Sequence, residues 1–404
     1  MPEDSAILSD FNGLAKAEPS LPTAWYSDPA HFALELSEIW GRSWLLFCRS
    51  AEIAAPNSWH AGQIAGRNVL AVRRADGTAA AFHNVCRHRG AEICPAGRGQ
   101  LDRPLLVCPY HQWSYRLDGS LVATGLARRV EGFDRSEHGL AAIACAEWGG
   151  YVFINLDAEG ATSLDGALGA ELAPLANWPL AELQVAHRDR IEIACNWKVF
   201  WENFNECLHC PGIHPELCDL VPIYGRGIMV AEDDPDWRGR GADGDPRHTG
   251  RLREGAESWT EGGAAQGAPL PGLTPDNIAR GHTYAVALPS VFVVGHRDYA
   301  RSVRVLPLGP ERTELTVEWL LPAGWETQPG LDLDAILRFS SRVLRQDAAA
   351  CEMNQRGLSA APFASGTLMQ EEYEVHAFHQ WVRARLGEAV APPASRASRR
   401  KPRS

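Results

Sequence analysis

Two short cysteine–histidine pairs in the first third of the chain constrain its fold more than any other feature. One pair is Cys86-x-His88, the other is Cys108-Pro-Tyr-His111, and residues 89–107 separate them. Thiolate sulfur and imidazole nitrogen are both strong ligands for iron and zinc. Because each pair supplies one cysteine and one histidine, we expect two similar loops that face a shared metal site.

Two kinds of metal centre use two cysteines and two histidines. A zinc finger places both cysteines in one knuckle and both histidines in the other. A Rieske 2Fe-2S centre instead has two thiolates on one iron and two imidazoles on the other. The mixed pairs in this chain favour the Rieske centre, and they predict Cys86, His88, Cys108 and His111 as its ligands.

Composition and charge limit the other possibilities. The chain has 404 residues, of which 45% are hydrophobic, and this suffices for two or three domains. We find neither a long apolar run nor a basic segment followed by an apolar stretch at the N-terminus, so we expect no membrane association and a cytoplasmic location. The net charge of -11 argues against nucleic acid as a partner.

Ten cysteines in a chain of this length do not predict a disulfide scaffold. Apart from the two cysteines assigned to the cluster, we expect reduced thiols that pack as small hydrophobic groups. Cys207 and Cys210 form a Cys-x-x-Cys pattern, which can also indicate a redox or metal site. Two histidines in the same stretch make a different metal site the stronger interpretation.

Local patterns predict how the chain is divided into domains. Residues 1–42 form an N-terminal helical segment, for which Ser27 or Asp28 is the expected helix cap. Short apolar runs separated by Asp-Gly turns predict an all-β domain over residues 43–157, which contains both metal loops. A Gly- and Ala-rich stretch then leads to a second domain over residues 183–386.

The second domain combines helices with strands rich in β-branched and aromatic residues. We expect helices over 196–206 and about 333–356, with strands over 283–320 between them. Residues 232–272 are rich in glycine and lack periodicity, so this segment is a candidate cover over a site. Residues 387–404 are basic, which predicts a disordered tail.

A second candidate metal site lies in this domain. His209 and His214 flank Pro211-Gly212, which cannot continue a helix, so both imidazoles can face one ion. Asp347, on the late helix, is the best candidate for a third ligand. Two histidines and one carboxylate form the facial triad of non-haem Fe(II) oxygenases, which leaves positions open for dioxygen. The alternative is two ordinary hydrogen-bonded histidines and an exposed aspartate.

Together these motifs resemble those of the terminal oxygenase (alpha) subunits of Rieske non-haem iron oxygenases. The resemblance covers roughly residues 24–386 and rests on the cluster loops, on Glu206-x-x-His209-x4-His214 and on Gln346-Asp347. It implies an α+β fold, in which an N-terminal all-β Rieske 2Fe-2S domain precedes a START-like helix-grip catalytic domain with an antiparallel sheet. It also implies an enzyme with two cofactors, a 2Fe-2S cluster and a mononuclear Fe(II), which uses O2 to hydroxylate a small substrate.

The resemblance further implies a homotrimer, in which the cluster of one chain lies near the mononuclear iron of its neighbour. An acidic residue links a cluster histidine to an iron-ligating histidine across that interface. By its position in the motif this residue is Glu206, which would link His88 or His111 to His209. Because no G-x-G-x-x-G fingerprint follows a strand, we expect a separate NAD(P)H-dependent reductase, with or without a ferredoxin.

Most relatives have aspartate where this chain has Glu206. A glutamate at this position resembles the motif of the branch that oxidises quaternary ammonium compounds, such as glycine betaine, choline, carnitine and stachydrine. That branch implies oxidative N-demethylation, in which a methyl group is hydroxylated and released as formaldehyde. Such a cation favours an aromatic cage, which the 14 tryptophans could help to form, but no substrate-binding residue follows from the sequence.

Three other functions remain open at this point. The first is an aromatic-ring hydroxylating mono- or dioxygenase, which would use the same metal centres. The second, from another class, is a Rieske electron-transfer protein without oxygenase activity. The third is a binding protein in which His209 and His214 have a structural role.

Overall fold

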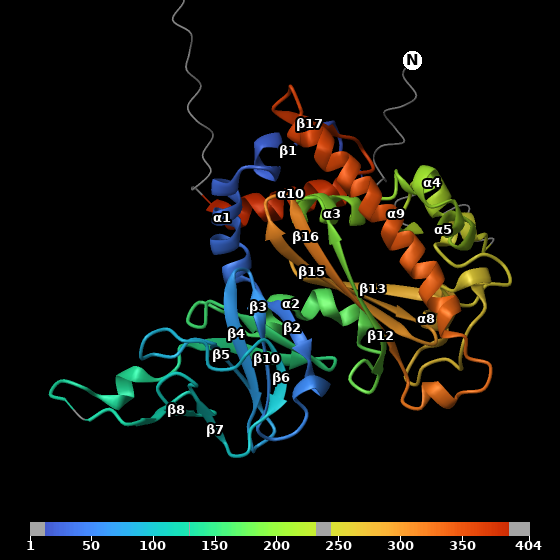
Figure 1. Ribbon diagram of the computed structural model, residues 1–404. Coiled ribbons are helices and arrows are strands. Elements are labelled where there is room, and N and C mark those ends of the chain that lie inside the picture. The colour runs from blue at the N-terminus through green and yellow to red at the C-terminus, as the bar shows by residue number, and fades with distance from the viewer. Residues whose placement is uncertain (1–12, 129, 232–243, 388–404) are drawn as a thin grey trace, which may run out of the picture.

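The computed structural model describes residues 13–128, 130–231 and 244–387. The early part of the chain forms two antiparallel sheets (Figure 1). The larger sheet has seven strands in the order β2 (Leu45–Arg49), β11 (Tyr151–Asn155), β10 (Ala142–Trp148), β5 (Ala79–His83), β4 (Arg67–Arg73), β3 (Ser58–Ile64) and β6 (Gly97–Gln100). The smaller sheet has the order β7 (Leu105–Val107), β8 (Trp113–Arg116) and β9 (Leu121–Thr124).

The later part of the chain is built around one antiparallel sheet of five strands. Their order is β12 (Gln184–Ile193), β16 (Arg312–Leu321), β15 (Ala300–Gly309), β14 (Val291–His296) and β13 (His282–Ala287). Two helices, α3 (Trp197–Phe204) and α9 (Leu333–Ser359), lie across this sheet (Figure 1). An N-terminal part made of strands is followed by a part that combines an antiparallel sheet with helices, which confirms the expected α+β fold. The domain bounds drawn from the sequence remain predictions.

Helices α3 and α9 pack through apolar side chains. On α9 the stripe includes Ile336, Phe339, Val343 and Leu344, all buried. α3 starts at Asn196, whose side chain accepts a hydrogen bond from the Lys198 amide at 3.0 Å, a typical N-cap. This packing fixes the two helices against the same sheet, so side chains at the end of α3 and in the middle of α9 can meet.

The N-terminal segment packs against the second domain. Asp28 caps α1 (Pro29–Glu38) by accepting a hydrogen bond from the Ala30 amide at 2.8 Å, which confirms one of the two expected caps. Glu35 from α1 is fully buried and contacts Lys198 Nζ at 2.5 Å. Strand β1 (Glu18–Pro22) pairs with β17 (Ser365–Leu368), and α10 (Tyr373–Leu386) follows.

Several elements differ from the sequence expectations. The Gly- and Ala-rich stretch after residue 157 contains helix α2 (Leu164–Leu172), which packs between the two large sheets through Leu164, Leu168 and Leu172. The remaining helices are short: α4 (Cys210–Ile213), α5 (Pro215–Leu220), α7 (Pro246–Thr249) and α8 (Pro275–Arg280).

Two of the predicted segments fall wholly or partly outside the described residues. Positions 232–243 of the glycine-rich segment are among these, and so is the basic tail apart from Gly387. In the part of the chain that the structure describes, every helix is too short or too polar to span a lipid bilayer.

Candidate metal centres and pocket

The two Cys/His loops come together at one edge of the β domain. Cys86 and His88 follow β5, and Cys108 and His111 lie between β7 and β8. Both thiols are buried, at 2% and 1% exposure, whereas His88 is exposed and its ring centroid lies 4.6 Å from that of His111. Buried sulfurs and outward imidazoles fit a 2Fe-2S group whose histidine-bound iron lies nearer the surface.

Neighbouring aromatic residues support these loops. The Tyr115 hydroxyl lies 3.2 Å from Cys86 Sγ and accepts a hydrogen bond from the Arg87 amide at 3.0 Å. Trp113 stacks on His88 with a centroid distance of 4.9 Å. Burial raises the pKa of the Cys86 thiol, a penalty on the thiolate that a bound metal cation would relieve.

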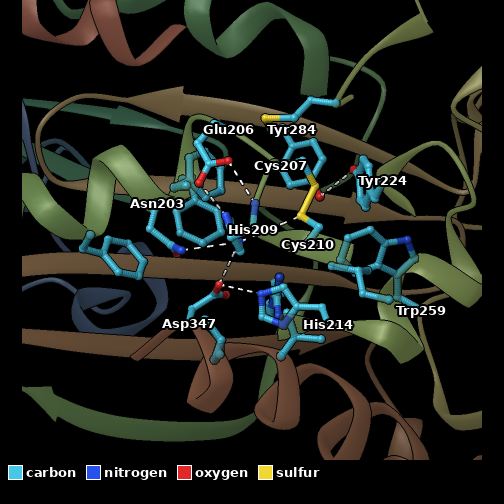
Figure 2. Close-up of a pocket in the computed structure, with 18 residues that line it drawn as sticks. Asn203, Glu206, Cys207, His209, Cys210, His214, Tyr224, Trp259, Tyr284 and Asp347 are labelled. Atoms are coloured by element: carbon cyan, nitrogen blue, oxygen red, sulfur yellow. Dashed lines mark hydrogen bonds and ion pairs between the residues drawn. A yellow bond between two sulfur atoms is a disulfide. The ribbon is translucent and has the colours of Figure 1, made fainter. Parts of the chain in front are cut away.

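The second candidate site brings together three side chains from two distant parts of the sequence. His214 Nε2 lies 2.8 Å and His209 Nε2 lies 3.5 Å from Oδ1 of Asp347. One ligand atom from each of the three lies within 4.8 Å of the other two. Figure 2 shows both imidazoles directed toward the Asp347 carboxylate. Two neutral imidazoles and one carboxylate in this arrangement fit a divalent iron.

The outer nitrogens of both histidines are held by acceptors. Nδ1 of His209 lies 2.5 Å from Oε1 of Glu206, and Nδ1 of His214 lies 2.8 Å from Oε1 of Gln346. An Nδ1–H that donates to such an oxygen leaves Nε2 free to bind a metal. The structure therefore places Glu206 behind His209, as the motif predicts, and adds Gln346 as the equivalent support for His214.

Charge also favours a cation at this site. Burial by itself lowers the pKa of His209, but hydrogen bonds to Asp347 and Glu206 outweigh this effect and raise the pKa to about 9. Burial alone would raise the pKa of Asp347, but the two imidazoles lower it on balance. The carboxylates thus stabilise positive charge on the imidazole pair, and a divalent ion would replace those protons.

The turn between Glu206 and His214 corrects one expectation. Cys207 and Cys210 form a disulfide, with their Cα atoms 4.9 Å apart, so the prediction of reduced thiols is wrong for this pair. The turn after α3 brings the two side chains within the distance that a disulfide requires. The other eight cysteines are free thiols in the structure.

A pocket adjoins the three candidate ligands. Its volume is about 80 Å³, and because one water needs about 10–15 Å³, it has room for a small molecule. Figure 2 shows Tyr224, Tyr284 and Trp259 facing the space beside the two histidines. The aromatic residues that line the pocket are Phe200, Phe204, Tyr224, Trp259, Tyr284 and Phe292.

None of these aromatic residues was singled out from the sequence. Tyr284 and Phe292 lie on strands that the sequence predicts, but their side chains face the pocket only because of the register of β13 and β14. Trp259 comes from the segment 232–272 that was expected to cover a site. That hypothesis remains a prediction, although one described residue of the segment does line the pocket.

The two candidate metal centres lie far apart within one chain. β7 and β8, which flank one cluster loop, are at the opposite end of the molecule from α4 and α9 (Figure 1). Electron transfer between the two centres of a single chain would therefore have to cross the length of the molecule.

Comparisons with known proteins match both parts of the chain. Residues 43–134 match a family model described as the Rieske [2Fe-2S] domain, and residues 180–388 match one described as the ring hydroxylating alpha subunit (catalytic domain). The glycine betaine monooxygenase oxygenase subunit of Chromohalobacter salexigens is 33% identical over 387 residues, which cover 91% of this chain and 85% of the relative.

Two more comparisons extend this result. The chloroplastic choline monooxygenase of Beta vulgaris is 29% identical over 391 residues, which cover 94% of this chain and 80% of that protein. The crystal structure of the quaternary ammonium Rieske monooxygenase CntA with an inhibitor has a TM-score of 0.67. That match covers 96% of this chain and 99% of CntA at 22% identity, and it supports the fold.

Proposed function

Because the chain belongs to the family of Rieske oxygenase alpha subunits, we propose that it removes an N-methyl group oxidatively from a small quaternary ammonium compound. The observation that carries this proposal is the aromatic lining of the pocket beside His209, His214 and Asp347. Rings in this arrangement attract a methylated ammonium ion through cation–π contacts.

Family membership confirms several sequence expectations. The protein is an oxygen-incorporating oxidoreductase with a Rieske 2Fe-2S domain and a catalytic domain that binds mononuclear iron. The alternatives of an electron carrier and of a binding protein without catalysis are therefore wrong.

We assign the mononuclear iron to His209, His214 and Asp347, since these three form a compact donor set of the facial-triad type. The cluster is assigned to the four residues of the Cys/His loops, namely Cys86, His88, Cys108 and His111. When bound, the cluster stores electrons and the iron activates dioxygen. Glu206 and Gln346 hold the two imidazoles so that each Nε2 faces the ion.

The proposed electron path runs between neighbouring chains. Within one chain the cluster loops and the iron ligands lie at opposite ends (Figure 1). Glu206 contacts His209 from the outer side and is only partly buried, so its carboxylate can approach a cluster histidine of a second chain. A homotrimer arranged in this way, supplied by a separate NAD(P)H-dependent reductase, would complete the path.

Reaction at the pocket needs few residues beyond the metal ligands. The aromatic rings would hold the trimethylammonium group with one methyl beside the iron ligands, and they would exclude water from it. Hydroxylation of that methyl takes one oxygen atom from O2, and the other atom leaves as water with two electrons from the reductase and two protons from the solvent. The hydroxyl group of the N-hydroxymethyl product then loses its proton to water, and the C–N bond breaks to release formaldehyde and a tertiary amine.

The test is a coupled assay of the purified protein with a generic Rieske reductase, NADH and O2. We expect formaldehyde in proportion to NADH consumed when a betaine-type compound is present. Trp259→Leu should raise the KM for that compound more than it lowers kcat, because a cation–π contact binds the ammonium group throughout the reaction. A cis-diol from an aromatic compound, with no formaldehyde from any ammonium compound, would contradict the proposal.

A further inference from the structure

A buried arginine in the pocket lacks the partners that such a group normally needs. Arg301 lies on β15, is 4% exposed and lines the same pocket as the aromatic rings. Among the described residues, its Nε and Nη1 atoms have no hydrogen-bond acceptor. A buried charge without a partner destabilises the folded protein, and binding of an anion to this guanidinium would remove that destabilisation.

The other two buried arginines among the described residues, Arg49 and Arg73, are paired with nearby groups. Arg49 donates to the carbonyls of Leu180 and Leu183, and Arg73 forms a two-point pair with Glu147. Arg304, three residues along the same strand and only partly buried, donates from Nη1 to the carbonyl of Phe47 at 2.9 Å, although its Nε has no acceptor. The absence of such contacts at Arg301 is therefore not a general property of arginines in this fold.

Sheet register directs Arg301 toward the pocket. Tyr284 pairs with Val294, Val294 pairs with Arg301, and Arg301 pairs with Trp319, so the four side chains form one row across β13, β14, β15 and β16. Tyr284 and Arg301 both line the pocket. Val294 separates the two in the row, so the guanidinium and the Tyr284 ring border the same pocket from strands two positions apart.

Among the described residues, no carboxylate forms an ion pair with Arg301. Burial lowers the pKa of Arg301, and the charges that oppose this effect come from Tyr299, Tyr284 and Asp347. The two tyrosines are neutral near pH 7, because burial raises the pKa of both. Asp347 is a proposed iron ligand, so its charge is committed to the metal.

We propose that Arg301 binds a carboxylate of the substrate and so selects a zwitterion that carries both a methylated ammonium group and a carboxylate. This inference rests on the proposed function and narrows its substrate class. The carboxylate lies on the guanidinium, and the ammonium group lies among the aromatic rings toward His209 and Asp347. Arginine suits this role because its planar fork can donate two parallel hydrogen bonds to one carboxylate.

The same arrangement disfavours an ammonium compound without an acid group. Such a ligand would bring a second positive charge into a buried space that already holds an uncompensated guanidinium, and like charges in a low-dielectric site repel strongly. A zwitterion supplies its own negative charge between the two cations. Arg301 therefore acts as a specificity-determining residue that separates betaine acids from choline-type alcohols.

Equilibrium binding to the holoenzyme tests this inference with three probes of similar size. Glycine betaine has both charges, choline has only the ammonium group, and 3,3-dimethylbutanoate has only the carboxylate. We expect Arg301→Met to weaken glycine betaine and 3,3-dimethylbutanoate by at least about 30-fold, which corresponds to about 2 kcal/mol. Choline should bind the variant as well as, or better than, it binds the wild type.

Arg304→Met is the matched control, since it removes a partly buried guanidinium from the same strand but from outside this pocket. We expect it to leave the binding of all three probes unchanged and to lower the thermal midpoint, because its hydrogen bond to Phe47 is lost. Arg301→Met should keep or raise the thermal midpoint of the ligand-free protein, because an unpaired buried charge is removed. A purely structural Arg301 would give the opposite shift in midpoint.

Failure of this inference can be told apart from failure of the proposed function. If the wild type releases formaldehyde from glycine betaine but Arg301→Met binds all three probes normally, the carboxylate site is wrong and N-demethylation stands. If 3,3-dimethylbutanoate binds in an Arg301-dependent way but no ammonium compound yields formaldehyde, the carboxylate site stands and N-demethylation is wrong. Equal weakening of choline and glycine betaine by Arg301→Met would overturn the inference.

Discussion

One carboxylate oxygen of Glu206 lies 2.5 Å from Nδ1 of His209, and the other accepts a hydrogen bond from the Leu208 amide. The short Glu206–Leu208–His209 turn thus fixes the carboxylate behind an imidazole whose opposite nitrogen faces Asp347. In the proposed function Glu206 has two tasks, to orient His209 and to provide a negative charge between His209 and a cluster histidine of a second chain.

Glu206→Gln separates these two tasks. The amide oxygen can still accept from Nδ1–H of His209, so we expect both metals to remain bound. The negative charge is lost, and we expect cluster-to-iron electron transfer to slow by about 10–100-fold, as for other supports of metal ligands. Stopped-flow absorbance of the cluster after mixing with O2 and substrate measures this rate. Cluster oxidation as fast as in the wild type would contradict the role.

Asp347→Ala should abolish turnover while the cluster spectrum survives. The carboxylate is one of three proposed iron ligands, and the Cys/His loops lie at the other end of the chain (Figure 1). Metal analysis should show loss of the mononuclear iron and retention of the cluster. Asp334→Ala, which changes an exposed carboxylate near the start of the same helix, is the control. Product formation by Asp347→Ala would refute the ligand assignment.

The pair Glu35–Lys198 should contribute strongly to stability. Both side chains are fully buried and lie 2.5 Å apart, and removal of one partner leaves a buried charge uncompensated. We expect Glu35→Gln to lower the free energy of unfolding by about 3–5 kcal/mol. Chemical denaturation measures it. Glu192→Gln, which breaks an exposed pair with Arg312, should change little, and an equal loss in both variants would count against this explanation.

The free energy of unfolding should decrease as the pH is lowered through the range in which His282 is neutral in the folded protein but protonated in the unfolded chain. Burial, followed by the charge of Arg280, lowers the pKa of His282 to about 4. The unfolded chain binds a proton near pH 6.5, so between these values the unfolded state holds more protons and stability rises with pH.

Thermal midpoints measured between about pH 6.5 and 4 test this dependence. Other groups titrate in the same range, so the comparison is between variants. His282→Gln should show a shallower slope than the wild type, whereas His187→Gln, at an exposed position, should leave the slope unchanged. Identical slopes for all three proteins would show that His282 does not contribute.

The sequence predicts the metal centres better than it predicts the pocket. The pairs Cys86/His88 and Cys108/His111 and the spacing of His209 and His214 are local patterns, because ligands close in sequence must share a loop. Asp347 is distant in sequence; it was chosen as an acidic residue on the predicted late helix, and the resemblance of the Gln346-Asp347 motif then supported that choice. The structure brings these residues together as that motif implies.

Pocket residues depend on information that a single sequence does not hold. Arg301 and Arg304 are three residues apart on one strand, so alternation places them on opposite faces, but nothing local shows which face borders the pocket. Only the sheet register shows that one lines the pocket and the other pairs elsewhere. Likewise, Trp259 lies in a segment without periodicity, and its place beside Tyr224 and Tyr284 arises from tertiary packing.

Helix α2 was missed for a different reason. Its glycines and alanines suggested a linker, but Leu164, Leu168 and Leu172 recur with helical spacing and Ser163 provides the N-cap. The periodic signal was present and the compositional signal was given more weight. The disulfide between Cys207 and Cys210 was missed because a spacing of three residues is equally compatible with free thiols.

The central claim is that electrons stored on the cluster are used for N-demethylation at the His209, His214 and Asp347 site. A single-turnover experiment tests it directly, with the holoenzyme reduced under anaerobic conditions, freed of reductant and then mixed with O2 in the presence or absence of glycine betaine. The account predicts that cluster oxidation, followed by EPR, accelerates with glycine betaine and that formaldehyde appears in the same mixture. Rapid cluster oxidation with glycine betaine but without formaldehyde would contradict it.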